Sequence, residues 1–332
     1  MKKSALCATI EKNRTDTIYE EIAMNIITIT LNPAVDLHYS LERLTPLGYN
    51  EARFMRRDSG GKGVNLSRAL LAGGVKSTCY IALGKAGAEE FLSPIRECGI
   101  DPLVTLVDGR ARENINLMQD GGETVIASVG PRLGEPELAD MEKKLAPLVD
   151  SDTVIVLAGS IPKGTDKYAV LKILMKFHRQ GAKIAVDSKS FDLEDIIPLS
   201  PYLAKPNEDE AQSLTGIAVT DKDSAIKAAL AIRDMGVEAV LLSMGADGAV
   251  LATESGVYVA NAPRITPVST VGAGDSTLGG FLASKFSGMS DADSLRSAVA
   301  FGSAACLEEG SMPPRSAVIK KLLPEIDIKR EM

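Results

Sequence analysis

Short apolar stretches rich in β-branched residues alternate along the chain with stretches in which apolar residues recur every three or four positions. The first pattern predicts strands and the second predicts amphipathic helices. Strands are expected at 25–31, 77–83, 153–157, 183–186, 202–204 and 239–243, and helices at 64–73, 86–98, 165–180 and from 207 onward. This alternation predicts an α/β fold with a mostly parallel sheet and helices on both faces.

Two segments, 34–59 and 112–128, interrupt this alternation. In the second segment, two β-prone runs flank a turn signal at 120–122, which predicts a hairpin. We expect strands from both segments to form a small sheet over one edge of the main domain. The last third of the chain is expected to be helical, with the apolar residues between 295 and 306 on one face.

The N-terminal residues 1–23 are mostly polar and contain no apolar run of seven, so they predict neither a secretory signal nor a membrane anchor. We expect them to be an extension outside the fold, either disordered or arising from a non-native start. A β-branched stretch begins directly after Met24. The folded unit is therefore expected to span 24–332.

Composition and charge disfavour several classes of function. The 332 residues include 37 Lys and Arg against 44 Asp and Glu, a net charge of −7, which disfavours a general grip on nucleic acid or anionic lipid. The apolar runs are far too short to span a membrane. Four cysteines without CxxC spacing and two histidines argue against a zinc site, a disulfide framework and a His-rich metal centre. We expect a cytoplasmic protein that acts on a small molecule through carboxylates, basic side chains and backbone amides.

The strongest candidate for chemistry is the segment Thr270–Ser276, where Gly272 and Gly274 open a predicted helix. Glycines there let backbone N–H groups converge on an anion, and the helix dipole adds positive potential. Asp275 falls in the first turn, beside that anion. This suits phosphoryl transfer, in which a carboxylate accepts the proton of an attacking hydroxyl. The structural alternative is a glycine-rich turn with Asp275 as an ordinary N-terminal helix carboxylate.

A second glycine-rich segment, 59–65, also precedes a predicted helix. Gly61 lets a ligand lie against the backbone, Lys62 offers a cation and Asn65 can hydrogen-bond to hydroxyls, although a tight helix entry explains the segment equally well. Asp36 follows the first strand, at the edge where open α/β sheets bind ligands. It can accept two sugar hydroxyls or be a turn aspartate. The chain lacks GxxxxGK[ST] and GxGxxG, which disfavours a Walker-type NTPase and a Rossmann dehydrogenase.

Three further segments follow predicted strands or open the hairpin. Asn207 and Glu210 have the spacing of a reciprocal helix cap, and the same pair suits a hydrated magnesium ion, which takes only one or two protein ligands. The turn from Ser243 to Gly248 can hold a nucleotide phosphate by its backbone, as many β-turns can. Arg112 opens the hairpin, and a guanidinium directed into a cleft reads a phosphate, whereas an exposed arginine is simply solvated.

Taken in order, these pieces resemble the ribokinase-like sugar kinases of the phosphofructokinase B family, from Met24 to about Glu309. The motifs that carry the resemblance are 32–36, 60–65, 158–164, 205–210, 243–248 and 270–276. The resemblance implies a three-layer α/β/α domain with a small β-sheet lid, ATP and Mg²⁺, and transfer of the γ-phosphoryl group to a sugar hydroxyl.

The resemblance also implies roles for individual residues. Asp275 is similar to the catalytic base, and Gly272, Ala273 and Gly274 to the anion hole. The metal pair is matched by Asn207 and Glu210. The remaining matches are to nucleotide positions, Lys205, Asn207, Ser243, Gly245, Gly248 and Thr270, and to sugar positions, Asp36, Gly61, Lys62 and Asn65.

Within the family, the opening 32–36 resembles the branch that acts on phosphorylated sugars, and Arg112 aligns with the arginine that reads the sugar phosphate. We therefore expect phosphorylation of fructose 1-phosphate, with tagatose 6-phosphate or fructose 6-phosphate as alternative substrates. A catalytically silent nucleotide- or sugar-binding regulator is the alternative from another class. A homodimer formed through the lid is a further expectation of the resemblance.

Overall fold

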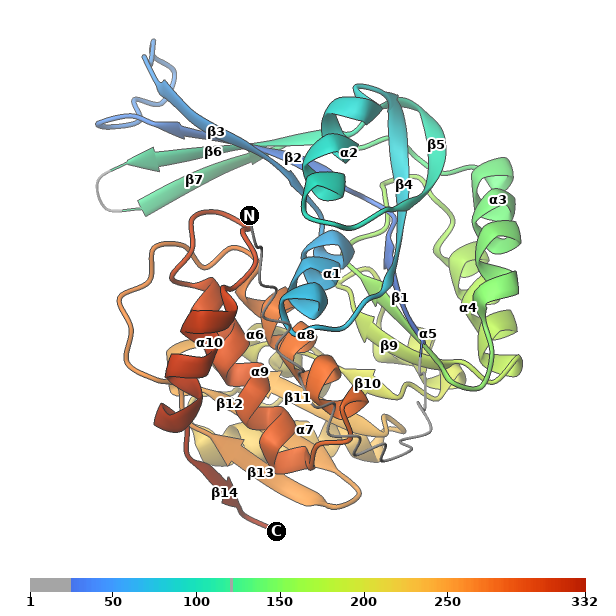
Figure 1. Cartoon of the computed structure of the whole chain (residues 1–332), viewed down its shortest axis with the longest axis vertical. Coiled ribbons are helices and arrows are strands. Elements are labelled where there is room, and N and C mark those ends of the chain that lie inside the picture. Colours follow the sequence, from blue (N-terminus) through green and yellow to red (C-terminus); the bar gives the residue numbers. More distant parts are fainter. Residues whose placement is uncertain (1–24, 120–121) are drawn as a thin grey trace, which may run out of the picture.

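A computed structural model describes residues 25–119 and 122–332. Ten strands form one sheet in the order β14-β13-β12-β11-β10-β9-β8-β1-β4-β5 (Figure 1). The bounds are β1 Asn25–Thr30, β4 Thr78–Ala86, β5 Leu103–Arg110, β8 Thr153–Ala158, β9 Lys183–Asp187, β10 Leu203–Ala204, β11 Ala239–Ser243, β12 Ala249–Thr253, β13 Gly256–Ala260 and β14 Ile328–Arg330. The strands from β5 to β11 are parallel, and β12, β13 and β14 extend that edge in antiparallel fashion.

Helices cover both faces of this sheet. They are α1 Lys62–Ala72, α2 Ala88–Glu97, α3 Glu135–Leu145, α4 Lys167–Arg179, α5 Leu193–Ile196, α6 Glu208–Thr215, α7 Lys222–Asp234, α8 Ala273–Phe286, α9 Asp291–Ala305 and α10 Ser316–Leu322, with short 3₁₀ turns η1 Ala146–Leu148, η2 Ile197–Leu199, η3 Gly245–Asp247 and η4 Leu323–Glu325. Successive residues of β8 alternate between the two layers. Val154 and Val156 pack with α1, α8, α9 and α10, whereas Ile155 and Leu157 pack with α3, α4 and α7. The expected three-layer fold is therefore confirmed.

A separate small sheet has the strand order β3-β2-β6-β7 and stands out from the main body (Figure 1). Its strands are β2 Ala34–Ser40, β3 Arg53–Gly60, β6 Arg112–Gln119 and β7 Gly122–Ala127. β2 pairs in parallel with β6, while β2–β3 and β6–β7 are antiparallel. Apart from Gly60 at the end of β3, the strands fall within the two segments, 34–59 and 112–128, that interrupt the sequence pattern. Residues 120 and 121 of the predicted turn, and the extension 1–23, lie outside the described residues.

The expectation of a helical last third is wrong for the strands β12, β13 and β14. The first two form a hairpin whose residues are mostly apolar on both faces, because α7 and α9 cover its two sides. Full burial removes the alternation of apolar and polar residues that marks a half-exposed strand. Within the described part of the chain, no helix has both the length and the apolar character needed to cross a bilayer.

Candidate active site

A polar cavity of 660 Å³ opens between the carboxyl ends of the parallel strands and the small sheet. We call it the polar cavity. The ends of β9, β10 and β11 contribute Asp187, Lys205 and Ser243. The residues singled out from the sequence that line it are Asp36, Gly61, Lys62, Asn65, Arg112, Lys205, Asn207, Glu210, Ser243, Gly245, Gly272, Gly274 and Asp275. Segments separated by more than 200 residues in the sequence thus meet at one edge of the sheet, as the strand order requires.

The N-terminus of α8 forms the floor where the chemistry is expected. Gly272 caps the helix with φ 76°, in the left-handed region that favours glycine. A Cβ at Gly274 would lie 3.3 Å from the Lys205 ammonium, so glycine leaves room for a cation against the first turn. Asp275 is buried, and the Asn65 side-chain amide donates to its Oδ2 atom at 2.9 Å.

Burial and the nearby negative charge of Asp187 raise the pKa of Asp275 to about 6, against the opposing effects of Lys62, Asn65 and Lys205. A surface aspartate has a pKa near 4 and is a weak base. Asp275 combines ionisation at neutral pH with a higher proton affinity, which is the combination a general base needs.

Sequence reasoning missed Asp187, which is buried at the end of β9. Its Oδ1 atom lies 2.9 Å from the Lys62 ammonium and 3.8 Å from that of Lys205. Burial opposes its ionisation, but the two lysines hold the pKa of Asp187 below the usual value. The sequence offered one signal, a carboxylate directly after the apolar run Ile184–Val186.

The inner face of the small sheet is polar. Asp36 on β2 stands opposite Asn114 on β6, whose side-chain amide donates to Asp36 Oδ1 at 2.7 Å, and Asn116 lines the same cavity. Burial raises the pKa of Asp36, although Asn114, His38 and Arg112 work against this. The Arg112 guanidinium donates to the Asn32 carbonyl and to Asn114 Oδ1, both at 3.3 Å. This face therefore offers closely spaced acceptors and donors to a polyhydroxylated ligand.

Asn207 and Glu210 form the reciprocal cap of α6. Asn207 Oδ1 accepts from the Glu210 backbone N–H at 2.8 Å, and Glu210 Oε2 accepts from the Asn207 N–H at 3.0 Å. Both residues also line the polar cavity. The helix cap and the binding of a magnesium ion are therefore compatible. The cap uses Glu210 Oε2 and not Oε1, which lies 3.5 Å from the Lys189 ammonium.

A second, apolar cavity of 590 Å³ adjoins the first, and we call it the apolar cavity. Ser243, Gly245 and Gly274 line both. Of the remaining sequence candidates, Gly248, Thr270 and Ala273 line only the apolar cavity. The glycine at 248 also has a packing reason, since its φ is 101° and a Cβ would collide with the Ala260 carbonyl.

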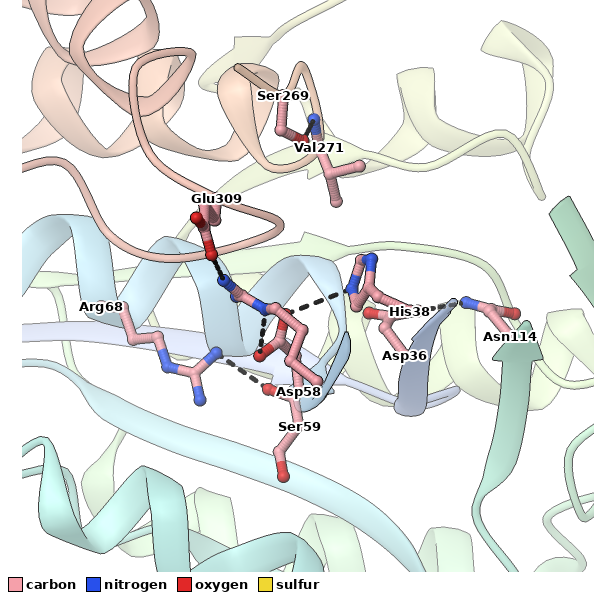
Figure 2. A network of polar contacts seen from close by, with 10 residues as sticks. Asp36, His38, Asp58, Ser59, Arg68, Asn114, Ser269, Val271 and Glu309 are labelled. Carbon is pink, nitrogen blue, oxygen red and sulfur yellow. Dashed lines mark hydrogen bonds and ion pairs between the residues drawn. The ribbon is translucent and has the colours of Figure 1, made fainter. Parts of the chain in front are cut away.

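Polar contacts tie the base of the small sheet to the main body (Figure 2). Arg56 on β3 pairs with Asp58 and reaches Glu309, beyond α9, at 3.2 Å. His38 Nε2 lies 3.2 Å from Asp58 Oδ2. Although burial opposes ionisation of Asp58, His38 and Arg56 hold its pKa below the usual value. Arg56 thus links the small sheet to the segment that follows α9.

Comparisons with known proteins agree with this geometry. The family model for pfkB family carbohydrate kinases matches residues 27–317. The chain is 32% identical over 305 residues to the 1-phosphofructokinase of Bacillus subtilis, covering 92% of this chain and 99% of that protein. It is 31% identical over 291 residues to a tagatose-6-phosphate kinase of Staphylococcus epidermidis, covering 86% and 93% of the two chains.

A structural relative supports the same assignment. The phosphofructokinase-2 of Escherichia coli superposes with a TM-score of 0.84 at 26% identity, over 91% of this chain and 99% of that one. The match therefore extends over most of both chains. The chain belongs to the pfkB family of carbohydrate kinases.

Proposed function

We propose that this protein transfers the γ-phosphoryl group of ATP to fructose 1-phosphate. The observation that carries the proposal is the position of Asp275, a buried carboxylate with a pKa of about 6, on the helix turn that separates a polar cavity from an apolar one. A base at that junction lies between a sugar hydroxyl on one side and a nucleotide on the other.

In the proposed reaction, Asp275 accepts the proton of the sugar's terminal hydroxyl. The hydroxyl oxygen forms a bond to the γ-phosphorus, the bond from that phosphorus to the bridging oxygen breaks, and ADP leaves with the electron pair. Backbone N–H groups of Gly272, Ala273 and Gly274 hold the negative charge on the transferring group. Lys205, which lies against Gly274, adds a positive charge at the same point.

The polar cavity has the oxygen ligands that a hydrated magnesium ion prefers. Asp187 Oδ2 is buried without a hydrogen-bond partner among the described residues, and Glu210 Oε1 is not used by the helix cap. In residues 25–119 and 122–332, no cluster of three or more Asp, Glu, His or Cys side chains could hold a metal. We propose that the ion lies near Asn207 and Glu210 and is bound mainly by water and phosphate oxygens. When bound, the ion neutralises charge on the phosphates.

The sugar would lie in the polar cavity under the small sheet, which acts as the lid. Asp36 and Asn65 are placed to hydrogen-bond with its hydroxyls, the backbone at Gly61 lets it approach closely, and Lys62 and Arg112 supply positive charge. The covering sheet excludes water, which would otherwise hydrolyse ATP.

The nucleotide would lie in the apolar cavity. Its walls consist mostly of small and apolar side chains, with Arg264 as the one charged residue among the described lining, and they suit a flat heterocyclic base. Thr270 and Gly248 line this cavity, and Ser243 and Gly245 lie on the rim shared with the polar cavity, where the phosphates would pass toward Asp275.

A homodimer through the small sheet is part of the proposal. The sheet exposes Phe54, Met55 and Ile126 by 53%, 56% and 54%, and the loop between β2 and β3 exposes Leu47 and Tyr49 almost completely. Exposed apolar residues grouped in this way are typical of an interface. Light scattering is expected to give twice the chain mass, and a monomer at micromolar concentration would contradict the dimer.

The function is tested by the kcat/KM of ADP formation with magnesium-ATP and four acceptors: fructose 1-phosphate, fructose 6-phosphate, tagatose 6-phosphate and fructose. We expect fructose 1-phosphate to give the highest value. If tagatose 6-phosphate or fructose 6-phosphate is preferred, the mechanism stands and the substrate assignment is wrong. If no sugar supports ADP formation while nucleotide still binds, the protein is a silent binder and the proposed function is wrong.

A further inference from the structure

Two neighbouring arginines of β3 connect the small sheet to the main body at different places. Arg57 Nη1 lies 2.9 Å from Glu90 Oε2 on α2. Arg56 Nη1 lies 3.2 Å from Glu309 Oε2, in the segment that follows α9. Successive side chains of a strand point to opposite faces of the sheet, so the two arginines reach two different parts of the main body.

Arg56 belongs to the face of the small sheet that carries the sugar-binding candidate Asp36. Asp58 on β3 stands opposite Asp36 on β2, and Asn114 on β6 stands opposite Asp36 on its other side. Residues opposite each other on neighbouring strands share a face, and Arg56 precedes Asp58 by two positions, so it lies on that face too. Asp36 and Asn114 line the polar cavity. The face with Arg56 is therefore the one that the sugar would contact.

Arg56 has one partner within the sheet and one outside it. Its Nε atom donates to both carboxylate oxygens of Asp58, at 3.0 and 3.2 Å, and His38 Nε2 lies 3.2 Å from the same carboxylate (Figure 2). Two carboxylates opposite each other, those of Asp58 and Asp36, repel, so this face needs a cation beside Asp58. The guanidinium meets that need and still reaches Glu309 through Nη1.

The backbone after Glu309 packs directly on the pair formed by Arg56 and Asp58. Gly310 has φ 57°, in the left-handed region that favours glycine, and a Cβ there would lie 2.6 Å from Asp58 Oδ2 and 2.8 Å from Arg56 Nη2. A side chain at position 310 would strain the backbone and displace the ion pair. The contact between Arg56 and Glu309 is therefore part of a close packing contact and not an isolated pair on the surface.

The same segment also touches the N-terminus of α8. A Cβ built at Gly272 would lie 3.7 Å from the Ser311 Cα atom, so Ser311 lies against the helix cap. The Cys306 carbonyl accepts from the Val268 N–H at 2.7 Å, which ties the segment to the loop before α8. The segment 306–311 thus contacts both the small sheet and the start of α8.

We propose that Arg56 is a positioning residue for phosphoryl transfer, which holds the sugar-binding sheet against the start of α8 through Glu309. The inference rests on the proposed kinase function. The sugar would be held at Asp36 and the transferring group at α8, so the contact between these elements sets the distance from hydroxyl to phosphorus. A misplacement of about 1 Å can lower a rate about 100-fold. Neither large cavity has Arg56 among its described lining residues, so it acts through its partners.

A purely structural role for these ion pairs gives different results. An exposed ion pair contributes little to stability, so a structural role predicts small and similar effects when either Arg56 or Arg57 loses its glutamate partner. A positioning role predicts a lower kcat only when the partner of Arg56 is lost, with an unchanged KM for ATP. A displaced sheet also admits water to the start of α8, so ADP release should then exceed formation of the sugar ester.

The experiment compares Glu309→Gln, Arg56→Gln and the double variant, with Glu90→Gln as the matched control. Glu309→Gln leaves the pair of Arg56 with Asp58 in place, and Glu90→Gln removes the partner of the neighbouring arginine. The two glutamates are similarly exposed, at 76% and 64%. Loss of one partner therefore tests one contact at a time.

We expect kcat with the preferred phosphosugar to fall about 2- to 30-fold in Glu309→Gln and to stay within about twofold of the wild type in Glu90→Gln. The KM for ATP and the midpoint of thermal unfolding should not change in either variant. The double variant should be no slower than Arg56→Gln, because both substitutions remove the same contact. Amide hydrogen exchange in 306–311 and at the start of α8 should become faster in Glu309→Gln alone.

Three results would overturn the inference. An active wild type with an unchanged kcat in Glu309→Gln, or an equal loss of kcat in Glu90→Gln, removes the positioning role and leaves the kinase function intact. Unchanged hydrogen exchange in Glu309→Gln would show that the ion pair does not hold the segment in place. A wild type that phosphorylates no sugar overturns the proposed function, and the positioning role with it.

Discussion

The two large cavities that meet at Gly274 differ in how they can recognise a ligand. The apolar cavity is lined mostly by small and apolar side chains, so it selects mainly by shape and by burial of apolar surface. The polar cavity groups Asp36, Asp187 and Asp275 with Lys62 and Lys205, so it selects by charge and hydrogen bonds. Under the proposed function, the ATP base would be held by fit and the sugar by polar contacts, with the reacting bond where the cavities join.

The largest effect is expected from a substitution of Asp275, where the polar and apolar cavities meet. Asp275→Asn keeps the size of the side chain but cannot accept the proton, so kcat is expected to fall about 10²- to 10⁴-fold. Binding of ATP, measured by calorimetry, should stay close to that of the wild type, because the apolar cavity is unchanged. A near-normal kcat would remove Asp275 as the base.

The Arg112→Met substitution tests ligand binding in the polar cavity alone. We expect the KM for fructose 1-phosphate to rise about 10- to 100-fold, because a charge-assisted hydrogen bond to a phosphate is lost. The KM for ATP should not change. Equal effects on both KM values would mean that the substitution disturbs the fold and not one cavity.

The pH dependence of kcat/KM tests the electrostatics of the polar cavity. Asp275 must be ionised to act, and its pKa is about 6, so kcat/KM should fall about tenfold per pH unit below pH 6 and level off above it. Lys62 lowers the pKa of Asp275, so Lys62→Met should move the acidic limb to higher pH. A limb that stays in place in this variant would contradict the assignment of the limb to Asp275.

The smallest expected effect concerns the apolar cavity and needs no substitution. Cys306 lines this cavity, and burial raises the pKa of its thiol, so alkylation should be slow. ATP at ten times its Kd should slow alkylation of Cys306 about tenfold more, because only the free protein reacts. Cys98 is exposed and serves as the internal control in the same peptide map. Equal protection of both cysteines by ATP, or no protection of Cys306, would show that the nucleotide does not bind in the apolar cavity.

The sequence predicted the local features well and the long-range ones poorly. The glycine-led start of α8 and the cap formed by Asn207 and Glu210 are short motifs, and their geometry follows from neighbouring residues. The contacts of Asp187 with Lys62 and Lys205 depend on three separate elements meeting at the sheet edge. No pattern within a window of the sequence carries that information.

Contacts between distant elements also explain why two other features were not predicted from the sequence. Asn114 was not singled out, because its role depends on standing opposite Asp36 across two strands far apart in the chain. The strands β12 and β13 lacked the alternation of half-exposed strands because helices cover both sides. The alternation of strands and helices, in contrast, is a repeated local signal, and it predicted the fold class.

In the proposed reaction, a phosphoryl group passes from ATP in the apolar cavity to a sugar in the polar cavity. The most direct test follows the reaction of magnesium-ATP and fructose 1-phosphate by ³¹P NMR, which distinguishes a new phosphate ester from inorganic phosphate. We expect a new ester on the C6 hydroxyl, formed in equal amount to ADP and lost in Asp275→Asn. Release of inorganic phosphate without a new ester would contradict it.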